Sequence, residues 1–267
     1  MITADKMSNA EYHATDAISS SDVKAVFGKS LAHWKHRAAF KPTIAMSIGT
    51  AVHDFCLEDG ENTVRGGADR RGKQWSDAFA EAEAHGKLLL TAGDYDLARN
   101  VADSVMFHPA GAKMAGPDTV NEASFFAKCP MTGMDIKCRP DSYDEKSGVI
   151  FDIKTCQSSA PKDVEADIRK YNYALQVAWY MYVMQNAGYK ADRFVLVFVE
   201  KTAPYAVNCC ELTMEYIDWA DVQMHKALAD IKQANDTQVW ESGYSIGINS
   251  VDIPPWLAQD AASTDDF

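Results

Sequence analysis

Long apolar runs and paired cysteines are both missing from this sequence. No window approaches the roughly 18 uninterrupted apolar residues that a membrane span needs, and the opening MITADKMSNAEYHATD lacks the basic and then apolar layout of a signal peptide. We therefore expect a cytoplasmic protein with no membrane partner. The six cysteines form no CxxC pair and no regular framework, which favours reduced thiols over disulfides. The lack of a CxxC pair also means that neither a zinc site nor an iron–sulfur cluster is expected, and no cysteine follows Cys210 to form a C-terminal cluster.

Acidic residues are missing from one stretch, although they are in excess overall. The net charge of −12 argues at first against a nucleic-acid partner, because phosphate binding normally needs a basic surface. No acidic residue lies between Asp22 and Asp54, however. The basic residues of that stretch and its surroundings are Lys24, Lys29, Lys35, Arg37, Lys41, Arg65, Arg70, Arg71 and Lys73. The segregation favours a basic lining within an acidic exterior; ordinary solvated faces are the alternative.

Apolar residues make up 47% of the 267 residues, which is enough for a packed core. Apolar spacing and capping residues predict helices over residues 18–30, 31–40, 46–59, 75–87, 91–111, 166–188 and 214–235. Residues 61–74 are polar and are expected to form a loop. Strand-like runs cover residues 119–128, 134–144, 147–155, 194–200 and 205–212, the first three as an antiparallel meander.

These elements predict one α/β domain with a central mixed sheet flanked by helices. It is expected to span residues 1–253, with a helical N-terminal part at about residues 12–115. The acidic tail, residues 254–267, is expected to be partly disordered.

The stretch CRPDSYDEKSGVIFDIKT, residues 138–155, carries the strongest chemical signal. In an antiparallel hairpin Asp141 and Asp152 can converge at one end, and alternation places Asp152 and Lys154 on one face. Ile153 then points into the core. Two carboxylates, the Ile153 carbonyl and a lysine can hold Mg²⁺, or Mn²⁺ in its place, against a phosphodiester while Lys154 orients or deprotonates water. An ordinary surface ion pair is the alternative.

Several motifs together resemble a known family. A PD turn, the strand VIFDIK and a helix carrying QVAWY resemble the PD-(D/E)xK nuclease superfamily, with its restriction-endonuclease-like core. GTAVH, with Gly49 and His53, and the pair Gln176 and Tyr180 resemble its RecB-like branch. YHATDAISSSDVKAVFGKSLAHWKHR, NEASFF and CRPD are similar to the catalytic domain of the RecE exonuclease (exonuclease VIII) and its phage relatives.

The resemblance implies roles for individual residues. Asp141 and Asp152 would be metal carboxylates and Lys154 the catalytic lysine, while His53 would bind the metal or orient a ligand. Glu122 would hold a second metal. Gln176 and Tyr180 would brace the site and touch the DNA backbone, with Tyr173 and Arg169 extending that face. A core histidine, an exposed strand glutamate and plain helix packing are the alternatives for these positions. Contacts to DNA and to a 5′ phosphate are sought at Arg37, Lys35 and Ser30.

A RecE-like protein is expected to be a processive 5′→3′ exonuclease on double-stranded DNA ends. It would leave a 3′ single strand for a RecT-like annealing partner in phage or prophage recombination. The resemblance also implies a homo-oligomeric ring, a tetramer as in RecE or a trimer as in the functionally similar λ exonuclease. The alternatives are another RecB-branch nuclease, such as an endonuclease or a CRISPR-adaptation nuclease, and a non-catalytic DNA-binding subunit.

Overall fold

The computed structural model describes residues 7–38, 42–244 and 247–255. Except for Pro254 and Pro255, the predicted acidic tail therefore lies outside the described residues. Within the described ranges, no helix combines the length and the apolar character that crossing a bilayer requires.

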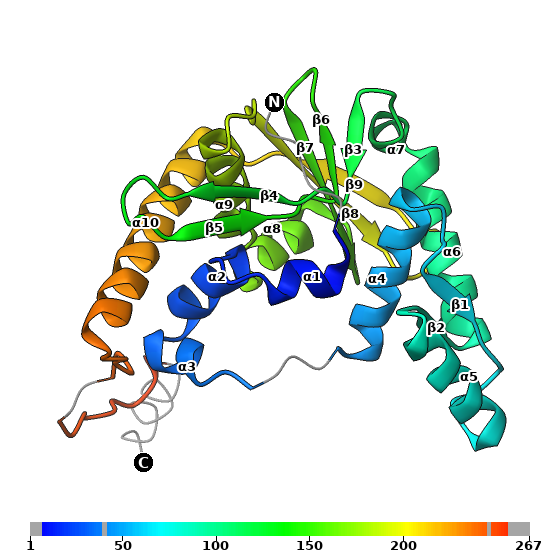
Figure 1. The fold of residues 1–267 in the computed structure, drawn as a ribbon, viewed down its shortest axis with the longest axis horizontal. Coiled ribbons are helices and arrows are strands. Elements are labelled where there is room, and N and C mark those ends of the chain that lie inside the picture. The colour runs from blue at the N-terminus through cyan, green and yellow to red at the C-terminus, as the bar shows by residue number, and fades with distance from the viewer. Residues whose placement is uncertain (1–6, 39–41, 245–246, 256–267) are drawn as a thin grey trace, which may run out of the picture.

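A mixed sheet of five strands forms the centre of the molecule (Figure 1). Its order is β3-β6-β7-β8-β9, with the strands Thr119–Asn121, Ser142–Asp144, Val149–Cys156, Arg193–Glu200 and Val207–Cys210. Strands β7 and β8 are parallel, and the other neighbours are antiparallel. The expected mixed α/β core is confirmed. The parallel pair needs a crossover connection, which two helices between β7 and β8 provide.

Alternation along β7 divides its side chains between the two sides of the sheet. Ile153 is buried in the core beneath helix α4, and Ile150 and Cys156 are buried in the core beneath helix α9. Because side chains alternate, Asp152 and Lys154 share the α9 side with Ile150 and Cys156. The strand therefore presents two charged side chains toward α9 and places Ile153 in the opposite core, as the sequence predicted.

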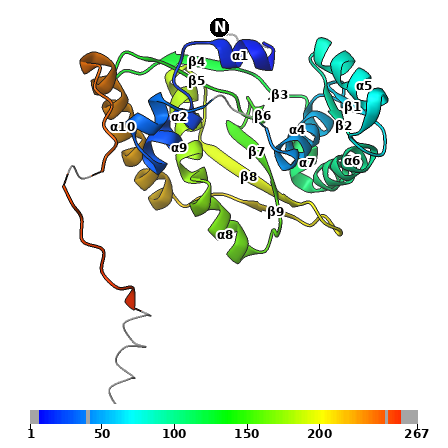
Figure 2. The same cartoon turned by 90° about the horizontal axis from the view of Figure 1, so that it is seen from below.

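Three helices cover the α4 side of the sheet (Figure 2). They are α4 (Ile44–Leu57), α6 (Ala92–Phe107) and α7 (Pro109–Met114). Next to them lie α5 (Gly72–Ala84) and a parallel pair of strands, β1 (Thr63–Arg65) and β2 (Leu88–Leu90). The loop prediction for residues 61–74 is thus wrong at β1 and at the first turn of α5, which begins at Gly72. That strand is too short to show a period, and its partner is distant in sequence.

The helices on the α9 side come from the N-terminal part of the chain, from the crossover between β7 and β8, and from the C-terminal part. They are α1 (Asn9–Ala14), α2 (Ser20–Gly28), α3 (Leu31–Lys35), α8 (Pro161–Lys170), α9 (Tyr173–Asn186) and α10 (Met214–Thr237). The single helix expected over residues 166–188 is two helices. Asn172 separates them with a left-handed φ of 53°, a conformation that asparagine tolerates better than most residues.

The predicted three-stranded meander is also divided. Strands β4 (Phe125–Lys128) and β5 (Asp135–Cys138) form a separate antiparallel pair, while β3 and β6 stay in the central sheet. The indole N–H of Trp179 donates to the Lys137 carbonyl at 2.9 Å, so β5 packs on α9. Two bends result, one at Glu122 between β3 and β4 and one at Asp141 before β6. Glu122 and Asp141, two of the three acidic residues of the candidate site, therefore lie where the chain passes between sheets.

Candidate active site

The pairing of β6 with β7 brings two aspartates together. Ser142 lies opposite Phe151, and continuing this register by one residue places Asp141 opposite Asp152. The backbone N–H of Ile153 donates to Oδ2 of Asp141 at 2.6 Å. Both aspartates are buried, with 8% and 1% of their surface exposed. The hairpin expected from the sequence therefore positions a pair of carboxylates beside the backbone of Ile153.

His53 joins α4 to this hairpin. Its Nε2 lies 3.1 Å from the carbonyl oxygen of Ile153, and its Nδ1 lies 3.2 Å from Oδ1 of Asp141. The Oε1 of Glu122 is 3.9 Å from the same Nδ1. An ordinary core histidine would not face two carboxylates, so this geometry favours the functional interpretation of His53.

Glu122 lies in the site because of its backbone conformation. Its φ of 50° is in the left-handed region, and its N–H donates to the carbonyl of Asp141 at 3.0 Å. A non-glycine residue in this region carries a conformational cost and is often found at functional sites. The side chain is half-buried. It is therefore not the fully exposed strand glutamate that the sequence left open.

The charges of this cluster are unbalanced. Burial and the neighbouring charge of Asp141 raise the pKa of Glu122 to about 8. Burial also opposes ionisation of His53, but Asp141 and Glu122 outweigh it and raise the imidazole pKa to about 9. For Asp141, burial is outweighed by the charge and hydrogen bond of His53, so the carboxyl pKa is lowered. The charged imidazole of His53 is one cation in this cluster. A further cation close to the carboxylate oxygens would relieve the remaining repulsion between them.

The residues present fit a divalent metal ion. One ligand atom each from His53, Glu122 and Asp141 lies within 4.8 Å of the others, and the Ile153 carbonyl is adjacent. Carboxylate and carbonyl oxygens suit Mg²⁺ and Mn²⁺, and an imidazole is accepted more readily by the transition metal. Asp152 is not in that group of three. Its place opposite Asp141 nevertheless keeps it beside the cluster.

Asp152 is held from the α9 side. Lys154 forms an ion pair with its Oδ1, and the amide of Gln176 donates to its Oδ2 at 2.5 Å. Burial raises the pKa of Asp152 despite the ammonium beside it. Burial alone would lower the pKa of Lys154, but the charges of Asp152 and Asp141 prevail and raise it. Lys154 is therefore held in its charged form, next to a carboxylate that the metal cluster also approaches.

Lys24 completes this side of the site, and sequence reasoning did not select it. Its Nζ donates to Oε1 of Gln176 at 3.2 Å, and Lys154 donates to the same oxygen at 3.4 Å. The aromatic ring of Tyr173 lies below both ammonium groups, 4.8 Å from Lys154 and 5.9 Å from Lys24. The only available signal was the lack of acidic residues after Asp22. That signal does not say which lysine reaches the centre.

The sequence also predicted Tyr180 and Arg169 as residues of the α9 face, and the two have different surroundings. Tyr180 packs on Phe194, with ring centroids 5.9 Å apart, and burial raises the pKa of its phenol well above the usual value. Arg169 is exposed near the end of α8. The structure thus brings Gln176 and Tyr173 into the cluster of side chains and leaves Arg169 outside it.

The three residues of the N-terminal segment that were predicted to contact DNA each interact with another side chain of the protein. Arg37 pairs with Asp22 at 2.6 Å, and the ammonium of Lys35 lies 4.3 Å from the ring of Trp240. Ser30 is buried with its hydroxyl 2.7 Å from Nδ1 of His33, where it caps α3. Their roles in DNA binding stay predictions.

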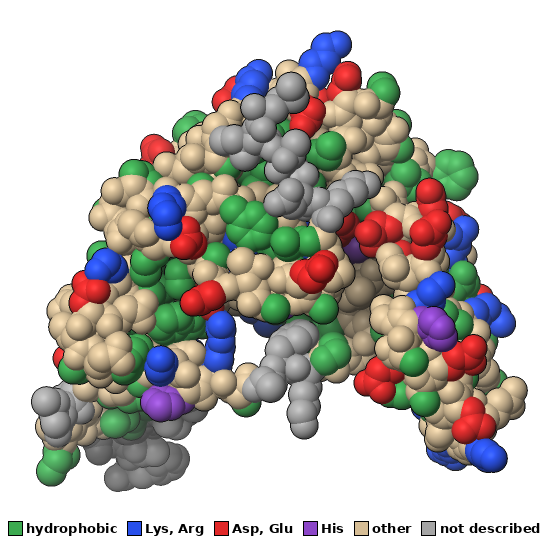
Figure 3. All heavy atoms as spheres, viewed as in Figure 1, with side chains coloured by type: hydrophobic (Ala, Val, Ile, Leu, Met, Phe, Trp, Pro, Cys, Tyr) green, Lys and Arg blue, Asp and Glu red, His purple; other side chains and the backbone are tan. Residues whose placement is uncertain are grey.

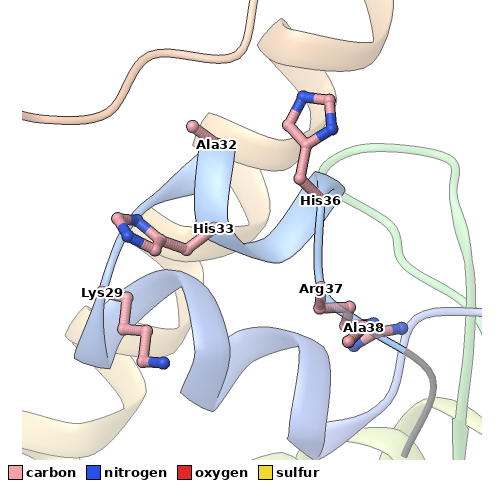
Figure 4. A pocket seen from close by; sticks show the side chains of 6 residues that line it. All are labelled: Lys29, Ala32, His33, His36, Arg37 and Ala38. Carbon is pink, nitrogen blue, oxygen red and sulfur yellow. The ribbon is translucent and has the colours of Figure 1, made fainter.

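A basic cavity lies beside these residues. Figure 4 shows its lining by Lys29, Ala32, His33, His36, Arg37 and Ala38, around a volume of about 450 Å³. On the face seen in Figure 3, the surface is hollowed between the side of α3 and the side of α5, and Lys and Arg side chains are visible at the hollow. None of the metal-cluster residues lines the cavity.

The fold and these residues define a PD-(D/E)xK nuclease core, as the sequence predicted. The chain belongs to the PDDEXK-like domain of unknown function family (DUF3799), whose profile matches residues 20–247. A comparison with curated proteins finds no match.

Solved structures resemble the chain in fold. A candidate exonuclease from Eubacterium rectale is 17% identical with a TM-score of 0.63, covering 98% of this chain and 100% of its own. A phage-related exonuclease from Haemophilus somnus 129PT is 14% identical with a TM-score of 0.39, covering 86% of this chain and 100% of its own. The first likeness supports the same fold, and the second adds no argument.

Proposed function

We propose that this protein is a Mg²⁺-dependent exonuclease that digests linear double-stranded DNA from the 5′ end. The observation that carries the proposal is the convergence of His53 from α4, Asp141 from the residue just before β6, and Asp152 and Lys154 from β7. These residues divide the site into a metal-binding half and a cationic half. A divalent ion bound by the first half would stabilise charge developing on the scissile phosphate.

The chain's own groups can perform the remaining tasks. Lys154 is fixed by Asp152 and Gln176, so its ammonium can orient a water molecule and stabilise negative charge at one place. His53 holds Asp141 and the Ile153 carbonyl in register. The buried setting strengthens each of these interactions, because charges interact more strongly away from bulk water.

The direction of digestion and the biological role rest on the RecE-like motifs. The similar structure from Eubacterium rectale is described as a candidate exonuclease, which supports the exonuclease activity but not its direction. The product would be a 3′ single strand for a RecT-like annealing partner, with the protein acting as a ring, a tetramer or a trimer. An endonuclease of the RecB-like branch is the second candidate, because the same catalytic residues could serve it.

A digestion assay separates these functions. Linear and circular duplexes of one sequence are incubated with Mg²⁺, with Mn²⁺ and with a chelator, and 5′-labelled and 3′-labelled ends are followed separately. We expect loss of the linear duplex only, release of the 5′ label first, and no reaction with chelator. Cleavage of the circle would establish the endonuclease instead, and no reaction with either ion would refute a catalytic role.

A further inference from the structure

Lys24 is an ammonium without a carboxylate partner inside the site. Among the described residues, its Nζ has one hydrogen-bond acceptor, Oε1 of Gln176 at 3.2 Å, and no ion pair. The side chain is half-buried on α2. Burial, together with the nearby charge of Lys154, lowers its pKa to about 8, and the opposing charge of Asp152 offsets this only in part.

Two ammonium groups share one neutral oxygen here. Lys154 also donates to Oε1 of Gln176, but its charge is balanced by Asp152. The charge of Lys24 is not balanced in this way. An uncompensated charge removed from water is costly, and such a group is usually satisfied by a ligand of opposite charge.

The position of Lys24 restricts what that ligand can be. The metal-cluster residues His53, Glu122 and Asp141 lie close to one another, whereas Lys24 is linked to Asp152 through Gln176. Resting on the proposed function, we infer that Lys24 binds a non-bridging oxygen of the DNA backbone, at a phosphate next to the one that is cleaved. Gln176 and the Tyr173 ring hold the ammonium in place for this contact.

A purely structural role predicts something different. If Lys24 only oriented the Gln176 amide, a neutral donor at this position would serve as well. If its charge binds phosphate, a neutral donor would weaken DNA binding and reduce the dependence on salt. Lys24→Gln keeps a donor and removes the charge, and Lys24→Arg keeps the charge. Lys146→Gln is the matched control, since Lys146 is exposed in the β6–β7 turn, at the far end of the hairpin from Asp141.

The test measures binding without cleavage. A short blunt-ended duplex labelled with fluorescein is titrated with each variant in chelator, and anisotropy is recorded over a series of salt concentrations. For Lys24→Gln we expect Kd to rise about tenfold and the slope of log K against log salt to fall by about 0.9. Lys24→Arg should keep the wild-type slope, and Lys146→Gln should match the wild type in both quantities.

Two results of this titration would overturn the inference. One is an unchanged Kd and slope for Lys24→Gln while the wild type binds; the other is an equally reduced slope for Lys24→Arg.

A second experiment needs no variant. Lysines of the wild-type protein are acetylated with and without the duplex, and mass spectrometry measures the modification of each. The duplex should slow modification of Lys24 severalfold and leave Lys146 unaffected, and equal modification of Lys24 with and without duplex would also overturn it. Failure of the wild type to digest DNA would refute the proposed function alone, because the salt slope is measured without cleavage.

Discussion

Nδ1 of His53 lies 3.2 Å from Oδ1 of Asp141, so helix α4 and the segment just before β6 meet at one pair of side chains. The other ring nitrogen reaches the Ile153 carbonyl at 3.1 Å. One imidazole therefore connects a helix on one side of the sheet to two neighbouring strands. The position of the candidate metal site depends on the packing of α4 as much as on the hairpin.

Replacing His53 by alanine should weaken metal binding. A ligand or ligand-orienting group of this kind typically contributes about 10- to 100-fold in affinity, and digestion should fall with it. Titration calorimetry with Mn²⁺ measures the affinity directly. His85→Ala is the control, because His85 is exposed at the end of α5. An unchanged Mn²⁺ affinity in His53→Ala would show that the imidazole has no role at the metal.

Asp152→Asn and Lys154→Met should each reduce digestion by orders of magnitude, because a metal-site carboxylate and the fixed ammonium would be lost. Asp152→Asn should stay folded, since an amide oxygen can still accept from Gln176. Initial rates on linear duplex and thermal melting by circular dichroism measure the two effects separately.

The exposed pair Lys190 and Asp192 provides a matched control, with the same two-residue spacing and a distance of 3.4 Å. Asp192→Asn and Lys190→Met should leave the digestion rate unchanged. If Asp152→Asn digested DNA at the wild-type rate, the assignment of the site to this hairpin would be wrong.

Gln176→Leu should lower kcat more than tenfold and also destabilise the protein by about 1–3 kcal/mol, because one buried and two partly buried hydrogen bonds lose their partner. Single-turnover kinetics and urea unfolding separate the two. Gln185→Leu on the same helix loses a hydrogen bond to the Ala191 carbonyl and controls for stability. Equal rates in the two variants would mean that Gln176 has only a structural role.

Stability should depend on Asp22 in a pH-dependent manner. Burial by itself raises the pKa of this carboxyl, but hydrogen bonds from Ser19 and Trp34 and the charge of Arg37 outweigh it, so the folded pKa is below 3.8. A group with a lowered pKa stabilises the folded state above its unfolded value and loses that contribution as pH falls through the folded pKa.

Asp22→Asn should therefore cost about 1–3 kcal/mol at neutral pH and progressively less as pH falls below about 4. Urea unfolding of both proteins over this range measures the difference. Asp77→Asn, on the exposed surface of α5, should cost little at any pH. A deficit that is the same at neutral and acidic pH would contradict the ionic explanation.

Several features of the site followed from the sequence because they depend on local periodicity. Side chains on a strand alternate, so the separation of Asp152, Ile153 and Lys154 was determined by spacing alone. A hairpin register brings residues on either side of its turn together, and this placed Asp141 opposite Asp152. The resemblance of the motifs to a known superfamily supplied the fold, which the family profile confirms.

Other features depended on how separate elements pack. The left-handed conformation of Glu122 follows from the passage of the chain between two sheets. Lys24 reaches Gln176 only because α2 packs beside α9. Neither the conformation of Glu122 nor the contact between Lys24 and Gln176 is indicated by a period or a motif in the sequence.

The sequence by itself determined which residue types occur in the hairpin and on which faces they point, because strand geometry repeats every two residues. Only the tertiary structure decided that Lys24 joins the centre and that Arg169 lies outside it. Contacts between distant segments are set by the packing of whole helices and strands, and side-chain packing is not encoded in any local pattern. For that reason His53 and Asp141 could be nominated from motifs, whereas Lys24 became visible only in three dimensions.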